Sequence, residues 1–387
     1  MCGIAYIFHK KNNLKKKLAL NLAKEFIDKR GPDYSSYFVS KNEFIFQSVL
    51  SIQSNKEEKN YKFNQSDDCF LYNGEIYSKD YGIIQNYDHS LDSINNLSKE
   101  RNLSHKLRSI DGMYAICKII RVNNQSVGVE IYRDPAGEKH LYYYKDSEKL
   151  VISSVPGFIK EYCNLNKLSN EIIFDYLSRR HLITSNKLCI DGIKQLKSGH
   201  KIEFNLNLNF EIKETIFKKI TEFFDPNLYL QLNSFSHQKY EKLLDEVIDS
   251  TSNKMVNGAN KNNSVGIISG GIDSSLSAYY LNKKGINLES SFCLDFNNKE
   301  IPTEISKEIS IKSNINIHNY IKPNIEDYKD SLERCIRLLA GPINTHSFAS
   351  SMIIAKEARK NNARVIYGGE GADELFLGYG WYGDMIS

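Results

Sequence analysis

The chain carries the sequence VGIISGGIDSS at residues 265–275. Apolar residues before the Gly270-Gly271 pair predict a buried strand, and the acidic and hydroxyl residues after it predict the start of a helix. Adjacent glycines let the backbone approach an anion, and the exposed N–H groups and helix dipole then favour phosphate or pyrophosphate. The stretch contains no lysine, so it differs from the Gly-x-x-x-x-Gly-Lys loop. A purely structural turn capped by Asp273 and Ser274 is the alternative interpretation.

The sequence around this turn alternates between strand and helix patterns. We expect strands at 264–268, 290–294 and 364–367, and helices at 240–256, 274–284, 303–312 and 348–360. This alternation predicts a doubly wound, mostly parallel α/β sheet. The last strand runs into GGEGADELFLGY at 368–379, a flexible turn that carries three carboxylates. At the carboxyl end of a parallel sheet such a group suits Mg²⁺ and a phosphate-bearing ligand; a solvated acidic loop is the alternative.

The first half of the chain is rich in short strand patterns. Strands are expected at 2–9, 38–39, 44–52, 69–72, 113–120, 127–132, 139–144 and 150–153, with a helix at 14–29. This many short strands indicates stacked sheets. The chain begins Met1-Cys2-Gly3, and removal of the methionine would leave Cys2 with both a thiol and a free α-amine. An amine with a pKa of about 8 can act as the base for its own thiol, the N-terminal-nucleophile arrangement. An ordinary small residue near a terminus is the alternative.

Length and composition limit the classes of protein to which this chain can belong. With 387 residues the chain suits two or three domains, and we expect one at 1–205, a linker at 206–235 around Asp225-Pro226, and one at 236–387. The net charge of +4, from 51 basic and 47 acidic residues, does not favour a nucleic-acid partner. Seven cysteines without regular spacing indicate reduced thiols in a cytoplasmic protein, not disulfides or a zinc site. No apolar run approaches the ~18 residues of a membrane span, so no membrane partner is expected.

Together, the motifs SGGIDSS and GGEGADELFLGY and the start Met1-Cys2-Gly3 resemble the glutamine-dependent asparagine synthetase family. The resemblance implies an α+β N-terminal-nucleophile glutaminase domain, a four-layer αββα sandwich, followed by an α/β doubly wound, parallel-sheet ATP-pyrophosphatase domain. Further motifs of the first domain are RGPD (30–33), YNGEIY (72–77), DGMYA (111–115), RDPAGEKHLYY (133–143) and the segment 192–200.

In the first domain, the resemblance makes Cys2 the nucleophile that attacks the amide of glutamine. The Asn73 side chain and the Gly74 backbone N–H would stabilise the oxyanion, where loss of one donor typically costs about 10²–10³ in rate. Asn-Gly is also the strongest short hairpin signal. Substrate contacts are assigned to Arg30, Glu75 and Asp88.

In the second domain, the resemblance implies ATP and Mg²⁺ as cofactors and a carboxylate acceptor, which is aspartate in the family. Glu370 would assist proton transfer when ammonia attacks the acyl-adenylate, after the ammonia has passed inside the protein. Metal ligands would be Asp273 and Asp373. The ATP contacts would be Ile267, Ser269, Gly270, Gly271, Asp273, Ser274, Ser275 and Gly369.

The sequence departs from the family in three places. Val49-Leu50-Ser51-Ile52 stands where the family has an arginine that clamps the glutamine α-carboxylate, a contact worth roughly 1.5–3 kcal/mol. Either another cation compensates, with Arg30 a candidate, or glutamine binds weakly, or the donor is not free glutamine. Thr303-Glu304 replaces an acidic pair. The chain stops at Ser387, whereas the family continues with a helical segment that carries a lysine for adenylation.

These departures leave several interpretations open. The chain is a truncated relative, half of a split enzyme, or a ligase for another carboxylate such as a sugar acid or small metabolite. A homodimer or a partner chain would supply the missing segment. A non-catalytic, partner-dependent subunit that only binds nucleotide is a further alternative. A nucleic-acid-modifying ATP pyrophosphatase shares the glycine turn, but neither the charge distribution nor the cysteines support it.

Overall fold

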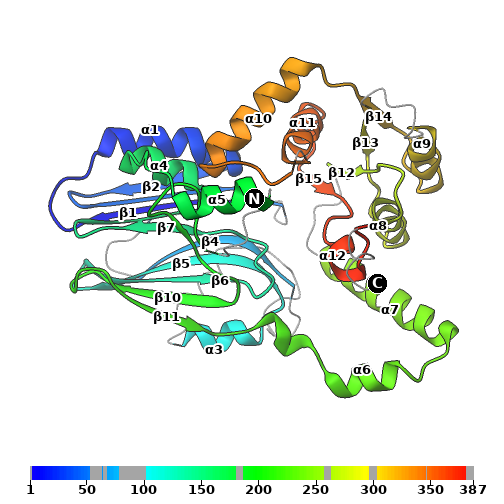
Figure 1. Cartoon of the computed structure of the whole chain (residues 1–387), viewed down its shortest axis with the longest axis horizontal. Coiled ribbons are helices and arrows are strands. Elements are labelled where there is room, and N and C mark those ends of the chain that lie inside the picture. The colour runs from blue at the N-terminus through cyan, green and yellow to red at the C-terminus, as the bar shows by residue number, and fades with distance from the viewer. Residues whose placement is uncertain are drawn as a thin grey trace. The chain divides into compact units, whose positions relative to one another are not determined.

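The computed structural model describes residues 2–52, 63, 68–77, 102–179, 186–256, 263–295, 303–345 and 347–380. The chain forms two compact units: unit 1 is Met1–Leu230 with Ile336–Asn344, and unit 2 is Gln231–Cys335 with Thr345–Ser387 (Figure 1). The division at 230/231 falls inside the range 206–235 that we expected to be a linker. That range also holds a strand of unit 1, so not all of it is connecting chain.

Unit 1 contains two antiparallel sheets. The six-stranded sheet has the order β2 (Tyr34–Val39), β3 (Glu43–Val49), β1 (Gly3–His9), β8 (Lys149–Ser153), β7 (Tyr142–Lys145) and β9 (Lys194–Gln195). The five-stranded sheet has the order β11 (Glu211–Ile216), β10 (His200–Asn205), β6 (Gln125–Arg133), β5 (Gly112–Val122) and β4 (Cys69–Ile76).

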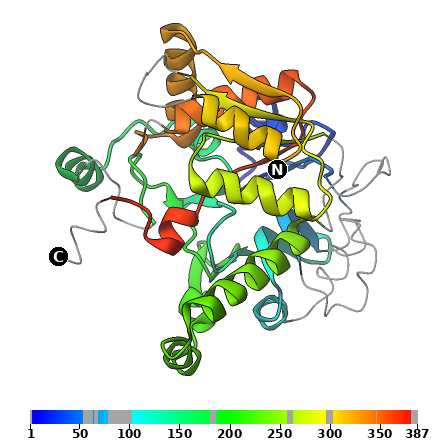
Figure 2. The same ribbon diagram turned by 90° about the vertical axis from the view of Figure 1, so that its right-hand side faces the viewer.

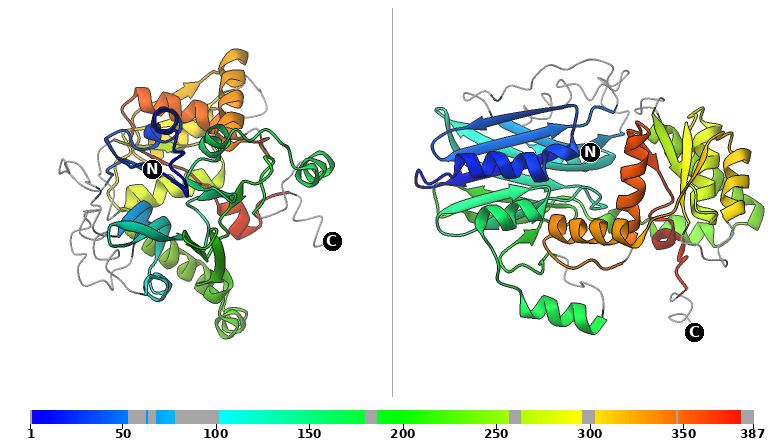
Figure 3. Two further views of the ribbon diagram at one scale, coloured as in Figure 1. Left: turned by 90° about the vertical axis from the view of Figure 1, so that its left-hand side faces the viewer. Right: turned by 90° about the horizontal axis from the view of Figure 1, so that it is seen from above.

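The two sheets pack face to face, with helices on both outer faces. Alternate residues such as Ile4, Tyr6 and Leu71 fill the space between the sheets. Helices α1 (Lys16–Phe26) and α4 (Pro156–Cys163) pack on the outer face of the six-stranded sheet, and α3 (Leu103–Arg108) packs on the other sheet (Figure 3). The expected four-layer αββα sandwich is therefore confirmed. The remaining elements of unit 1 are η1 (Asp28–Arg30), α5 (Asn170–Arg179), η2 (Ile220–Phe223) and most of α6 (Pro226–Leu232), which crosses into unit 2.

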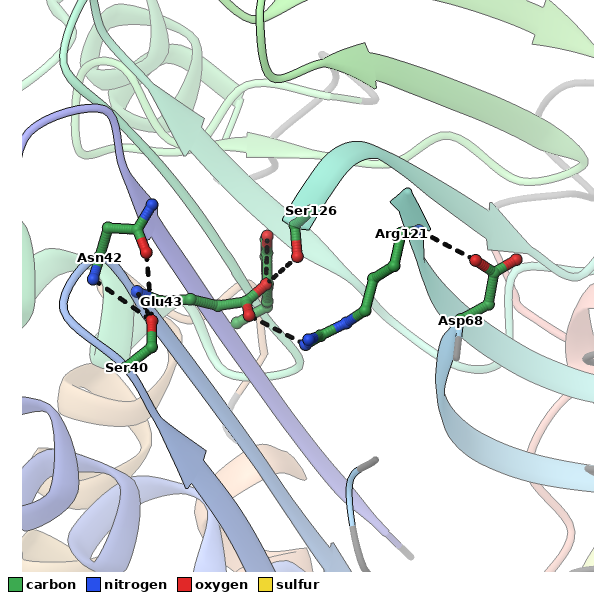
Figure 4. Close-up of polar contacts among 7 residues, drawn as sticks. Ser40, Asn42, Glu43, Asp68, Arg121 and Ser126 are labelled. Atoms are coloured by element: carbon green, nitrogen blue, oxygen red, sulfur yellow. Dashed lines mark hydrogen bonds and ion pairs between the residues drawn. The ribbon is translucent and has the colours of Figure 1, made fainter. Parts of the chain in front are cut away.

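A buried polar cluster joins the two sheets of unit 1. The Glu43 carboxylate on β3 accepts hydrogen bonds from Ser126 Oγ at 2.6 Å, Tyr6 OH at 3.1 Å and an Arg121 Nη at 2.9 Å (Figure 4). The side chains of Arg121 and Glu43 are only 2% and 6% exposed. Glu43 is the register partner of Phe8 on β1, so the cluster lies at the far end of β1 from Cys2.

Unit 2 is built on a parallel sheet with the order β14 (His318–Ile321), β13 (Ser290–Leu294), β12 (Ser264–Ile267) and β15 (Val365–Tyr367). One face packs against α8 (Ile272–Lys283) and the other against α11 (Ser347–Lys360), as expected for a doubly wound sheet (Figure 2). The other helices are α7 (His237–Val256), α9 (Thr303–Lys312), α12 (Ala372–Phe376) and α10 (Ile325–Leu339), whose residues from Ile336 onward belong to unit 1. All seven cysteines of the chain are free thiols. No helix in the described ranges is long and apolar enough to cross a membrane.

Candidate functional site

Cys2 lies immediately before β1, where that strand pairs with β3. Because Gly3 is the register partner of Ser48, Cys2 lies level with Val49. The turn that contains Gly31 packs against the backbone of β3, since a Cβ on Gly31 would lie only 2.2 Å from the Val49 nitrogen. This packing brings Arg30 to Cys2, and Arg30 Nε donates a hydrogen bond to the Cys2 carbonyl oxygen at 3.2 Å.

The electrostatics around the half-buried Cys2 thiol favour its protonated form. Burial raises the pKa of Cys2, while a hydrogen bond from the Leu50 backbone N–H and the positive charges of Arg30 and Lys139 oppose that increase. A thiol with a raised pKa is protonated at neutral pH, so it needs a base before it can act as a nucleophile.

Asn73 and Gly74 lie on β4, which passes over β1 from the opposite sheet. Asn73 is completely buried, and neither Oδ1 nor Nδ2 of its side chain has a hydrogen-bond partner among the described residues. Gly74 has φ +152° and is the register partner of Tyr114; a Cβ there would lie 2.0 Å from the Met113 carbonyl oxygen. The strand continues to Ile76, so the hairpin interpretation of Asn73-Gly74 is wrong.

A charged loop follows β6 at the same end of the sandwich. The buried Asp134 carboxylate accepts hydrogen bonds from the backbone N–H groups of Tyr114 (3.3 Å), Glu138 (3.0 Å) and Lys139 (3.0 Å). These bonds hold the loop against β5, and they explain why the strand expected at 139–144 begins only at Tyr142.

Two opposite charges lie in this region. Burial raises the pKa of Glu75, whereas the Lys139 ammonium lowers it. Burial in turn lowers the pKa of Lys139, and the carboxylates of Glu75 and Glu138 oppose that change.

The glycine turn of unit 2 connects β12 to α8. Gly270 has φ +95°, and Gly271 is the N-cap of α8 without a side-chain capping bond, so the cap we assigned to Asp273 and Ser274 is absent from that position. The turn is held by Ser274 Oγ, which donates to the Gly271 carbonyl oxygen at 3.2 Å and lies 3.2 Å from Ser269 Oγ. Ser275 Oγ also donates to the Gly271 carbonyl oxygen, at 2.5 Å.

The second motif of unit 2 packs directly against this turn. Strands β12 and β15 are neighbours, with Gly266 opposite Tyr367. A Cβ on Gly369 would lie 2.8 Å from both the carbonyl carbon of Asp273 and the nitrogen of Ser274. The loops that carry SGGIDSS and GGEGADELFLGY therefore meet backbone to backbone at the carboxyl edge of the sheet, where α/β proteins bind ligands.

Comparisons with known protein families match both halves of the chain. Residues 1–215 match the glutamine amidotransferase domain family, and residues 259–387 match the asparagine synthase family. The chain belongs to the asparagine-synthase-like glutamine amidotransferases. It is 25% identical over 406 residues to asparagine synthetase [glutamine-hydrolyzing] 1 of Bacillus subtilis, covering all of this chain and 60% of that protein. It is 26% identical over 429 residues to a putative asparagine synthetase [glutamine-hydrolyzing] 1 of Methanocaldococcus jannaschii, covering 98% of this chain and 69% of that protein.

Two solved structures also resemble the chain, each at 10% identity. The allosteric regulatory enzyme of purine biosynthesis aligns with a TM-score of 0.39 over 56% of this chain and 49% of its own. Glutamine phosphoribosylpyrophosphate amidotransferase from B. subtilis, complexed with ADP and GMP, aligns with a TM-score of 0.35 over 85% of this chain and 70% of its own.

The structure places the predicted site residues in two groups. Arg30, Asn73, Gly74 and Glu75 gather around Cys2, while Asp88 lies outside the described residues. In unit 2 the predicted positions lie at the end of β12, on the two loops that meet, and at the starts of α8 and α12. The positions predicted to contact ATP or Mg²⁺ are Ile267, Ser269, Gly270, Gly271, Asp273, Ser274, Ser275, Gly369 and Asp373.

Other predictions for unit 2 fit the structure less closely. Glu370 is exposed, and its carboxylate folds back over Gly368. Thr303 and Glu304 begin α9, and Ile305 lies beside the Gly270 turn. Within the described ranges, no group of three or more His, Cys, Asp or Glu side chains is arranged to hold a metal.

Sequence reasoning missed two residues of the site in unit 1. These are Lys139, which acts electrostatically on Cys2, and Asp134, which holds the Lys139 backbone in place. Both stand in RDPAGEKHLYY, the motif that we used only as a sign of the family. An acidic residue followed by proline and glycine indicates a turn held by its own side chain, and that was the available signal.

Proposed function

We propose that the chain is an ATP-dependent amide ligase that takes its nitrogen from glutamine. The observation that carries the proposal is the Asn73 side chain on the strand that passes over Cys2. It is a fully buried amide, and neither of its polar atoms has a partner among the residues that the structure describes. Leaving such a group unsatisfied costs about 1–3 kcal/mol, which is expected where a ligand or transition state supplies the missing partner.

In unit 1, the Cys2 sulfur forms a bond to the amide carbon of glutamine. Its proton passes, through the α-amine exposed by loss of Met1, to the leaving nitrogen, and ammonia departs. The negative charge that develops on the amide oxygen is stabilised by Asn73 Nδ2–H and the Gly74 N–H. Water then hydrolyses the thioester to glutamate. The raised pKa of Cys2 fits this scheme, because the thiol has to be deprotonated at the moment of attack.

In unit 2, the turn from Ser269 to Ser275 binds the phosphates of ATP through backbone N–H groups and hydroxyls. The acceptor carboxylate attacks the α-phosphorus, pyrophosphate departs, and ammonia displaces AMP from the acyl-adenylate, with Glu370 taking a proton. Asp273 and Asp373 offer the oxygen ligands that Mg²⁺ prefers, and the ion, when bound, would neutralise phosphate charge. Aspartate is the proposed acceptor because both curated relatives are named as asparagine synthetases.

The test follows two products of the purified chain, glutamate and pyrophosphate. Cys2→Ala should abolish glutamate release, whereas Cys163→Ala, at the end of α4, should leave it unchanged. Glutamate release that survives Cys2→Ala would exclude Cys2 as the nucleophile. Asp273→Asn should stop pyrophosphate release with ATP, aspartate and ammonia while glutaminase activity remains. Pyrophosphate release with a sugar acid but not with aspartate would show that the acceptor is the sugar acid and not aspartate.

A further inference from the structure

The candidate glutaminase site needs a positive charge that position 49 does not supply. Free glutamine brings an α-carboxylate and an α-ammonium into the site, and a buried carboxylate needs a cation or several N–H donors. Val49, the residue level with Cys2 on the neighbouring strand, offers an apolar side chain. The charge therefore has to come from another element at this end of the sandwich.

Besides the N-terminal amine, two cationic side chains act on Cys2, and they differ in what else they bind. Arg30 already donates its Nε–H to the Cys2 carbonyl oxygen at 3.2 Å. Lys139 is only 9% exposed. Across the described parts of the chain, its ammonium has no hydrogen bond and no carboxylate within ion-pair distance. The carboxylates of Glu75 and Glu138 act on this ammonium only from beyond ion-pair distance, so an incoming carboxylate could form a direct charge-assisted contact with it.

The strand register places Lys139 at the same edge of the sheet as Cys2. Ala5 on β1 and Tyr142 on β7 are both register partners of Ser153 on β8, so β1 and β7 run parallel with one strand between them. Three residues before Ala5 is Cys2, and three residues before Tyr142 is Lys139. Neighbouring strands lie about 4.8 Å apart, so the segments that precede β1 and β7 leave the sheet roughly 10 Å apart.

The second sheet fixes the same loop from the other side. Asp134 Oδ2 accepts a hydrogen bond from the Lys139 N–H at 3.0 Å and another from the Tyr114 N–H at 3.3 Å. Tyr114 is the register partner of Gly74, whose neighbours on β4 are Asn73 and Glu75. The backbone of Lys139 is thus held between the edge that carries Cys2 and the strand proposed to bind the oxyanion.

We propose that Lys139 binds the α-carboxylate of the donor glutamine, beside Glu75, which the family resemblance already assigns to the substrate. This inference rests on the proposed glutaminase function and assigns the amino-acid end of the same site. The Glu75 carboxylate and the Lys139 ammonium present opposite charges to the two charged groups of one zwitterion. A donor that lacks the α-carboxylate makes no use of Lys139.

The experiment compares Lys139→Met, Lys139→Arg and a control, Lys118→Met. The control removes a buried lysine of β5 that pairs with Asp68. The donors are glutamine and 4-aminobutanamide, which is glutamine without its carboxylate. Lys139→Met should raise the KM for glutamine about tenfold to a hundredfold with kcat nearly constant, the loss expected for one charge-assisted contact. Activity on 4-aminobutanamide should be unchanged, Lys139→Arg should recover most of the affinity, and Lys118→Met should leave both donors unaffected.

A second readout separates this proposal from the glutaminase proposal. Calorimetry measures glutamine binding to the Cys2→Ser protein, in which no turnover occurs, with and without Lys139→Met. Loss of binding on Lys139→Met supports the inference even where no glutamate release is detected. Equal effects of Lys139→Met on both donors, or glutamine binding that Lys139→Met leaves intact, would overturn it. Absence of glutamine binding to the Cys2→Ser protein would overturn both proposals.

Discussion

The contact between the two loops of unit 2 leads to a specific prediction for Gly369→Ala. A methyl group at this position would lie 2.8 Å from three heavy atoms, the carbonyl carbon and Cβ of Asp273 and the nitrogen of Ser274. Two of these are backbone atoms of the turn proposed to bind ATP, so no side-chain rotation relieves the overlap. The loops must separate by about 0.6 Å to reach the 3.4 Å at which ordinary carbon contacts begin.

A shift of this size is small for folding but large for catalysis. Overpacking of a well-packed site costs about 1–3 kcal/mol in stability, and a misplacement of about 1 Å at a reacting centre costs about 10²-fold in rate. We therefore expect Gly369→Ala to lower kcat/KM for ATP by about tenfold to a hundredfold. Release of glutamate by unit 1 should stay within about twofold of the unmodified chain, because the substitution touches only the two loops of unit 2.

The assay measures pyrophosphate release with ATP, aspartate and ammonia, alongside glutamate release from glutamine. The matched control is Gly380→Ala, on the same segment, where an added Cβ meets none of the described residues within 4 Å and the backbone φ is ordinary. This control should behave like the unmodified chain. Normal ATP kinetics in Gly369→Ala would refute the reasoning, because the two loops would then not need their observed contact.

Three further predictions concern unit 1. Asn73→Ala should lower kcat for glutamine hydrolysis by about 10²–10³ without lowering the melting temperature, because the amide it removes has no partner in the described part of the chain; a large loss of stability in thermal melting would contradict this. Because the pKa of the Cys2 thiol is raised, the rate of its alkylation by iodoacetamide, measured by mass spectrometry, should keep rising with pH beyond about 8.5, the ordinary thiol pKa. A rate that levels off near neutral pH would show a lowered pKa instead. Arg121→Met should destabilise unit 1 by about 3–5 kcal/mol by leaving the Glu43 carboxylate buried without its cation; denaturant unfolding measures this, and a change under about 1 kcal/mol would show that water replaces the arginine.

The parts of the fold that the sequence predicted are those with a local cause. The glycine turn after an apolar strand, the alternation in the second half and the short strands of the first half all depend on neighbouring residues, and each was found. The helix expected at 14–29 covers α1 but ends at Phe26, because η1 turns the chain before Gly31. The strand β14 and the helix α10, which lie between two predicted elements, were not predicted.

The parts that could not be predicted depend on contacts distant in sequence. Asn73-Gly74 has the local pattern of a hairpin turn, yet it lies inside a strand because β5 pairs with it along its whole length. Lys139 has the pattern of a strand residue, yet it lies in a loop because the carboxylate of Asp134 binds its N–H. In both cases a tertiary hydrogen bond overrides the local preference, and both residues belong to the candidate site.

The two ends of the unit 1 sandwich use buried polar groups in opposite ways. At the end away from Cys2, the Glu43 carboxylate accepts three hydrogen bonds and pairs with an arginine, so its burial is compensated within the fold. At the Cys2 end, the Asn73 amide and the Tyr72 hydroxyl are buried without partners among the described residues, and the mostly buried Lys139 has no ion pair among them. Each unsatisfied group costs about 1–3 kcal/mol. Groups of this cost, gathered on the strand and loop that surround one thiol, are better explained by a polar ligand that binds there than by packing, and a zwitterionic amide such as glutamine matches their charges.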